Sequence, residues 1–219
     1  MDLTPLAWVA AAWLLGTIPF AVLVTRRVAG ADPRAVADGN PGATNAFRAG
    51  GRAAGALATV LDIAKGTAPV AAAVALGAVP GWWLGAIIVA PVVGHCFTPW
   101  LRGRGGKGVA TTYGVLLPVS LPAGPVVLPL LLIGAWKTVV PDGWAATIAA
   151  ACAVGVVALS GAPVPAVVGA AVCAAIIAVR YRDLMAGGPR LRRRSAEPAA
   201  DVSADLHTGA GSGSPDGPR

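Results

Sequence analysis

Residues 143–179 read GWAATIAAACAVGVVALSGAPVPAVVGAAVCAAIIAV, a run that contains no Asp, Glu, Lys or Arg. Three further runs, residues 3–25, 66–101 and 108–136, share this property. A helix that crosses the hydrocarbon core of a bilayer needs about 20 mostly apolar residues. The sequence therefore predicts an all-α, polytopic membrane protein whose helices contact the lipid bilayer.

The composition of the 219 residues agrees with this fold class. Apolar residues make up 56% and charged residues 12%, with a mean hydropathy of +0.70. A soluble domain usually carries about 25% charged residues, so most water-soluble folds are excluded. The net charge of +7 rests on few residues, and we expect no nucleic-acid partner. The three cysteines lie in apolar stretches without a ligand spacing, which indicates neither a disulfide framework nor a metal site.

Apolar stretches predict spans at about 4–24, 56–78, 82–99, 144–160 and 163–179. The 108–136 run contains Pro118, Pro122, Pro125 and Pro129, which break or kink helices. It forms either one long kinked span or two short ones hinged near 118–125. The start of the chain lacks the basic region and cleavage site of a signal peptide, so we expect the first run to be retained.

Basic residues cluster in three segments, residues 25–52, 102–107 and 180–194, while the turns at 78–82 and 137–143 carry only Lys137 between them. The positive-inside rule places such segments in the cytoplasm. The 108–136 run must then enter and leave the membrane, which gives about seven transmembrane helices with the N-terminus outside and the C-terminus cytoplasmic. Residues 1–185 form the predicted membrane domain. Residues 186–219, rich in Gly, Pro and Ser, are the predicted disordered cytoplasmic tail.

Two glycine-rich loops in these basic segments could carry chemistry. Residues 37–48 read ADGNPGATNAFR, where Thr44 or Asn45 is suited to cap the next helix and Arg48 to reach an anion at its N-terminus. Residues 103–108 read GRGGKG. No strand precedes this segment, so it is no dinucleotide fingerprint, but small residues, Lys107 and a helix start together favour a phosphate site. The alternatives are an ordinary cytoplasmic loop and a basic stop-transfer loop.

Three further polar residues stand in or beside apolar helices. Asp62 and Lys65 share a helix face at spacing i, i+3, and are either a self-neutralising structural pair or functional. His95 follows Gly94 near the end of the third span, beside the basic loop, and is either structural or part of a site.

Five motifs resemble those of the PlsY family of bacterial acyl-phosphate:glycerol-3-phosphate acyltransferases. They are TIPF at 17–20, DGNPGATNAFR at 38–48, LDIAKG at 61–66, GHCF at 94–97 and GGKGVAT at 105–111, in the same order and with the same spacing as in the family. The resemblance implies a seven-helix enzyme of the plasma membrane with its active site at the cytoplasmic face. It implies transfer of an acyl group from acyl-phosphate to the 1-hydroxyl of glycerol 3-phosphate, giving lysophosphatidate, without metal or cofactor.

The resemblance also implies the site residues of this chain. The implied catalytic residues are Asn45, His95 and Lys107, and the implied substrate-binding residues are Asp38, Asn40, Thr44, Arg48, Lys65, Gly105, Gly106, Gly108 and Thr111. In this scheme Arg48 and Lys107 neutralise phosphates, the amides of 105–108 cradle one of them, and His95 orients substrate. No protein nucleophile is needed because acyl-phosphate is already activated.

Two positions depart from the family pattern. Asp38 stands where the family usually has Ser, and residues 180–189 lack the Asn and Glu of the family's third motif. We expect Asp38 to pair with a nearby cation such as Arg34 or Arg48, so that activity survives. The alternatives are a catalytically weakened paralogue that binds lipid or phosphate, and a small membrane transporter.

Overall fold

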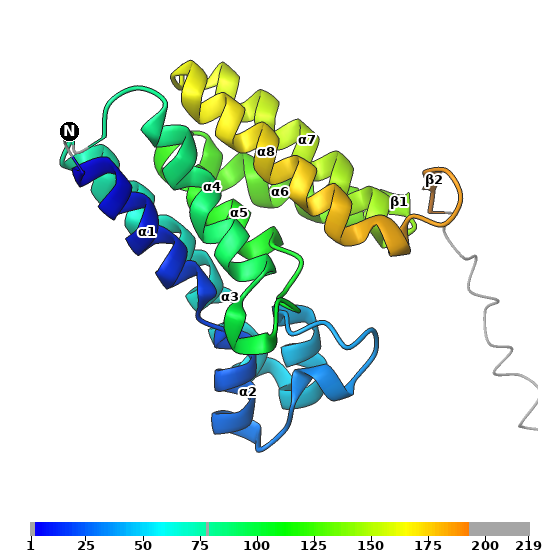
Figure 1. Cartoon of the computed structure of the whole chain (residues 1–219). Helices are drawn as coiled ribbons and strands as arrows, with labels where there is room; N and C mark the ends of the chain where they lie inside the picture. The colour runs from blue at the N-terminus through cyan, green and yellow to red at the C-terminus, as the bar shows by residue number, and fades with distance from the viewer. Residues whose placement is uncertain (1–2, 78, 193–219) are drawn as a thin grey trace, which may run out of the picture.

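The computed structural model describes residues 3–77 and 79–192, and this part of the chain is mostly helical (Figure 1). The α-helices are α1 Thr4–Thr17, α2 Phe20–Ala29, α3 Ala43–Ala75, α4 Trp83–Cys96, α5 Val109–Leu116, α6 Gly124–Thr138, α7 Asp142–Leu159 and α8 Val164–Tyr181. The 3-10 helices are η1 Pro33–Ala35, η2 Pro99–Leu101, η3 Leu117–Val119 and η4 Arg182–Leu184. Two short strands, β1 Val139–Val140 and β2 Arg190–Leu191, pair antiparallel.

Five helical segments of the described chain are long and apolar enough to cross a membrane. They are Thr4–Ala29, Ala43–Ala75, Trp83–Leu101, Asp142–Leu159 and Val164–Leu184. Two shorter apolar segments, Val109–Val119 and Gly124–Thr138, occupy the proline-containing run. That run therefore forms two helices with a turn between them, and the described chain has the seven apolar segments that the sequence predicts.

Two helix boundaries differ from the predicted spans. Pro19 separates α1 from α2, because proline lacks an N–H donor and its ring clashes with the preceding turn. The second span starts at Ala43 rather than near 56, and Gly51 (φ 75°, ψ −171°) interrupts its helical geometry. The start predicted from hydropathy is wrong because the first turns of α3 contain polar and charged residues among the alanines.

Small residues bring the helices close together around α4. A Cβ atom on Gly16 of α1 would collide with the carbonyl oxygen of Pro91 on α4, and one on Gly94 of α4 would collide with that of Trp13 on α1. Gly85 meets the backbone of α8 in the same way. Such residues let membrane helices approach to backbone contact, so α4 lies between α1 and α8 in the interior of the bundle (Figure 1).

The two ends of the bundle differ in character. The N-terminus, the α3–α4 turn and the α7–α8 turn gather at one end (Figure 1). The opposite end, here called the polar end, carries the loops 30–42 and 97–108 and the residues that follow α8. Strand β2 lies within the segment predicted as tail, and the rest of that segment, residues 193–219, lies outside the described residues.

Candidate active site

Asn45, in the first turn of α3, organises the loop 30–42. Its side chain is 1% exposed. Its Nδ2 donates to the carbonyl oxygens of Val36 (3.2 Å) and Asn40 (3.0 Å) and to Oδ1 of Asp38 (2.8 Å). These bonds tie the loop to the helix, so the amide nitrogen of Asn45 is already engaged within the protein.

The N-terminus of α3 is built differently from the prediction. Its N-cap is Gly42, and no side chain caps it, so the expectation that Thr44 or Asn45 provides the cap is wrong. Arg48, one turn into the helix, donates from Nη1 to Oδ1 of Asn45 at 3.0 Å. A guanidinium has five N–H donors, so this contact orients Arg48 toward the loop and leaves donor capacity for an anion.

Lys107 reaches across from the loop 97–108 to Asp38. Its Nζ forms an ion pair with Oδ2 of Asp38 and lies 4.7 Å from the centroid of the Tyr181 ring. Burial raises the pKa of Asp38, but hydrogen bonds from Lys107 and Asn45 outweigh that effect and hold the pKa below its ordinary value. The expected neutralisation of Asp38 therefore exists, but its partner is Lys107, while Arg34 pairs with Asp32.

These side chains line a pocket of about 360 Å³ at the polar end. Six predicted site residues contribute to its wall: Asp38, Asn40, Thr44, Asn45, Arg48 and Lys107. The remaining lining residues are Trp136, Asp142, Tyr181 and Leu184. The volume suits a small ligand. The charged lining residues are two cations, Arg48 and Lys107, and two carboxylates, of which Asp38 pairs with Lys107 and Asp142 with Arg192.

Lys65 does not line this pocket. Its side chain is 1% exposed and forms an ion pair of 2.8 Å with Asp62, and its Nζ donates to the carbonyl oxygen of Ile18 at 2.8 Å. A buried charge must be paired or hydrogen-bonded, and these contacts supply both. Lys65 thereby links α3 to the α1–α2 break, and its substrate-binding role stays a prediction.

His95 and the two adjacent glycines form one packed unit. Nδ1 of His95 lies 3.7 Å from Oδ1 of Asp62, and a Cβ atom on Gly106 would collide with Nε2 of His95. The amides of Gly105 and Gly106 donate to the carbonyl oxygens of Cys96 (3.1 Å) and His95 (3.2 Å). These two amides are already bonded and form no open phosphate cradle, and His95 supports the loop that carries Lys107.

Gly108 and Thr111 shape the start of α5. Gly108 is the N-cap with φ 86°, in the left-handed region that favours glycine. The N–H groups of the first helical turn have no partner within the helix. Thr111 is fully buried, and its carbonyl oxygen would collide with a Cβ atom on Gly66 of α3, so Thr111 packs against α3 and does not line the pocket.

Residues of α8 were missed as site residues. Arg180 donates from Nη2 to the carbonyl oxygen of Gly105 at 2.6 Å and lies 5.6 Å from the Phe97 ring centroid, so it clamps the glycine loop. Tyr181 lies against Lys107. The available signal was the basic stretch at the end of the last helix, where residues 180–189 stand in place of the family's third motif. Within residues 3–77 and 79–192, no three His, Cys, Asp or Glu side chains gather as metal ligands.

Comparison with known proteins identifies the family of this chain. Residues 6–187 match the glycerol-3-phosphate acyltransferase family. The chain belongs to this family. A solved structure of PlsY, an integral membrane glycerol 3-phosphate acyltransferase, in its glycerol 3-phosphate form is 35% identical, with a TM-score of 0.73, and covers 82% of this chain and 88% of that chain. Its lysophosphatidic acid form is 33% identical, with a TM-score of 0.70.

Curated relatives within the acyltransferase family are also similar. A glycerol-3-phosphate acyltransferase of Rubrobacter xylanophilus is 42% identical over 176 residues, which are 78% of this chain and 84% of that relative. One of Klebsiella pneumoniae is 44% identical over 128 residues. This match spans 56% of the chain and 62% of the relative, about three fifths of its length. Family membership and the apolar helices establish a multi-pass membrane protein.

Proposed function

We propose that the chain transfers a fatty acyl group from acyl-phosphate to the 1-hydroxyl of glycerol 3-phosphate, giving lysophosphatidate and phosphate. The hydroxyl oxygen forms an ester bond with the acyl carbon, the bond from that carbon to the phosphate oxygen breaks, and the hydroxyl proton ends on the released phosphate. The solved PlsY forms hold glycerol 3-phosphate and lysophosphatidic acid, one substrate and the product of this reaction.

The observation that carries the proposal is the convergence of Lys107 and Arg48 on one pocket beside an apolar slot. The slot, of about 40 Å³, is lined by residues of α5 to α8, including Val109 and Ile177. Ile177 lies one turn before Tyr181 on the same face of α8. The phosphate pocket therefore adjoins apolar surface, although the slot itself has room for only the first carbons of an acyl chain.

In this mechanism the chain supplies binding, orientation and charge. Lys107 and Arg48 hold the negative charge of the phosphate groups, and Asn45 keeps the loop 30–42 in the shape that presents them. A bound phosphate takes the place of the Asp38 carboxylate at Lys107. Electrostatic stabilisation by cations fixed in advance is a large contribution to catalysis of this kind.

We further infer that the polar end faces the cytoplasm and the N-terminus lies outside. The support is the concentration of basic residues in the loops of the polar end, which the positive-inside rule assigns to the cytoplasm. The seven apolar segments give the two termini opposite sides of the membrane.

A second candidate function is that of a protein that binds glycerol 3-phosphate without converting it to product. The Asp38–Lys107 ion pair favours this alternative, because the Asp38 carboxylate already pairs with the cation that would bind phosphate. The deciding experiment incubates the purified protein with acyl-phosphate and glycerol 3-phosphate and measures lysophosphatidate and free phosphate. We expect equal amounts of both products. Tight glycerol 3-phosphate binding without product would support the binding protein instead.

A further inference from the structure

A second hollow lies at the polar end, separate from the candidate active site. It is a groove of about 810 Å³ between the loops 30–42 and 97–108. Its lining residues are Asp32, Arg34, Ala35, Gly39, Trp100, Leu101, Arg102 and Arg104. None of them lines the pocket of Lys107. We call this hollow the arginine groove.

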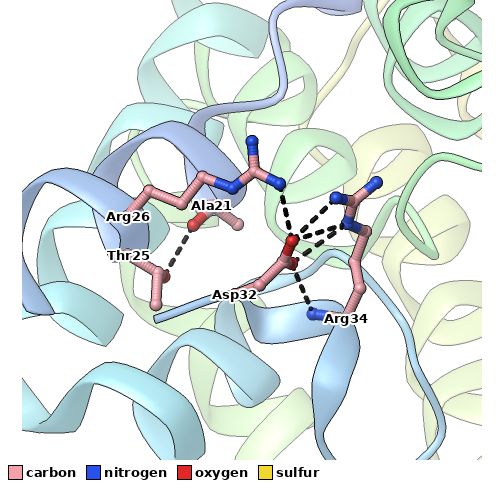
Figure 2. A network of polar contacts seen from close by, with 5 residues as sticks. All are labelled: Ala21, Thr25, Arg26, Asp32 and Arg34. Carbon is pink, nitrogen blue, oxygen red and sulfur yellow. Dashed lines mark hydrogen bonds and ion pairs between the residues drawn. The ribbon is translucent and has the colours of Figure 1, made fainter. Parts of the chain in front are cut away.

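The arginine groove carries an excess of positive charge. Its one carboxylate, Asp32, is held by two arginines that approach from opposite sides (Figure 2). Nη2 of Arg26 and Nη2 of Arg34 each lie 2.7 Å from Oδ2 of Asp32. Hydrogen bonding to Arg34 holds the pKa of Asp32 far below its ordinary value. Arg102 and Arg104 form no ion pair with any carboxylate in the part of the chain that the structure describes.

The wall that carries these two arginines is fixed by backbone hydrogen bonds. The amides of Arg102 and Arg104 donate to the carbonyl oxygens of Pro99 (3.0 Å) and Leu101 (3.0 Å). Oγ1 of Thr98 donates to the carbonyl oxygen of the last residue of α1. The backbone that carries the two guanidinium groups is therefore held in place, and binding has to order only the exposed arginine side chains.

Trp100 indicates the level in the membrane at which the groove lies. Its Nε1 donates to Oγ1 of Thr17 at 3.1 Å, where α1 ends, and its side chain is 69% exposed. Trp100 also lies near the end of the membrane-spanning segment Trp83–Leu101. Exposed tryptophans at the ends of membrane helices lie at the level of lipid headgroups, so the groove opens where lipid phosphates are found.

We propose that the arginine groove binds the phosphate of an anionic phospholipid from the surrounding bilayer. Guanidinium groups match phosphate oxygens with paired N–H donors, and basic pockets at the membrane surface attract anionic headgroups. The exposed Trp100 ring offers an apolar contact to the glycerol and upper acyl region of the lipid. This binding is independent of the acyl-transfer activity and needs neither substrate.

The test measures lipid binding to the purified protein in detergent by native mass spectrometry, with phosphatidylglycerol and with phosphatidylcholine of the same acyl chains. The groove variant carries Arg102→Gln and Arg104→Gln. The matched control carries Arg27→Gln and Arg52→Gln, which remove two exposed arginines outside the groove. Thermal melting of each variant checks that the fold is retained, and inorganic phosphate at millimolar concentration serves as competitor.

We expect the wild type and the control to bind phosphatidylglycerol in preference to phosphatidylcholine, and the folded groove variant to bind phosphatidylglycerol on the order of twentyfold more weakly. Equal weakening in the groove variant and the control, or unchanged binding in the groove variant, overturns the proposal. Displacement of the lipid by millimolar phosphate also overturns it and makes the groove a site for free phosphate. If the groove variant unfolds, the single changes Arg102→Gln and Arg104→Gln are measured against Arg27→Gln, with the same criteria.

Discussion

Asp38 couples the two glycine-rich loops of the candidate site. Its Oδ1 accepts from Asn45 and its Oδ2 pairs with Lys107, so one carboxylate shapes the first loop and holds the cation of the second. In this arrangement an incoming phosphate competes with Asp38 for Lys107. The carboxylate keeps Lys107 in position and opposes the binding of a dianion.

The change Asp38→Asn separates these two effects, because an amide oxygen still accepts from Asn45 but carries no charge. We expect the KM for glycerol 3-phosphate to fall about two- to fivefold, the effect of removing roughly 0.5–1 kcal/mol of repulsion at a partly exposed site. Steady-state kinetics at fixed acyl-phosphate measures this. Asp183→Asn, at an exposed residue outside the pocket, is the control. A KM that rises in Asp38→Asn alone would show that the carboxylate assists substrate binding.

Among single residues, the sequence identifies those site candidates that stand in a recognisable local pattern. Asp38, Arg48 and Lys107 stand in glycine- and asparagine-rich loops, which mark them as candidates. The contact of Arg180 with Gly105 joins two distant segments, and no local pattern indicates it. For Lys65, the i, i+3 spacing correctly indicates the partner Asp62, but spacing cannot tell whether such a pair faces a pocket or the interior.

The loop 97–108 is the element that presents Lys107, and His95 and Arg180 hold it in place. Gly106 lies so close to the His95 ring that no side chain fits between them. The sequence shows glycines in this loop but not their reason, since an open phosphate cradle and close packing on a ring both require small residues. Here close packing is the reason for Gly105 and Gly106.

The change Gly106→Ala should therefore displace the loop. Overpacking of this kind costs about 1–3 kcal/mol, and we expect a lower melting temperature together with at least a tenfold loss of kcat/KM. Gly134→Ala is the control, because a Cβ atom at Gly134 of α6 meets nothing within 4 Å and alanine favours a helix. An active, equally stable Gly106→Ala protein would contradict the packing described for His95.

The molecule as a whole is a bundle with one polar end. Its orientation in the membrane is inferred only from the distribution of basic residues. The apolar runs predict the seven apolar segments of the described chain, and hydrocarbon thickness accounts for the length of the five long ones. They do not predict the break at Pro19 or the early start of α3, because helix geometry there depends on backbone constraints rather than hydropathy.

Orientation is testable with single cysteines in a variant lacking the three native ones. We expect a cysteine at Arg104, at the polar end, to react with a membrane-impermeant maleimide only after cell lysis. A cysteine at Trp82, an exposed position in the α3–α4 turn, should react in cells whose outer surface is accessible. Labelling of position 104 from the outside would reverse the orientation.

The most direct test of the central claim is the turnover of Lys107→Ala, measured as lysophosphatidate formed from acyl-phosphate and glycerol 3-phosphate. A charge-assisted phosphate contact is worth about 1.5–3 kcal/mol, so we expect kcat/KM to fall roughly ten- to hundredfold while the melting temperature stays near that of the wild type. Lys137→Ala, at an exposed lysine of α6 that does not line the pocket, should retain wild-type turnover. Equal kcat/KM in the wild type and in folded Lys107→Ala would contradict the assignment of this pocket as the acyl-transfer site.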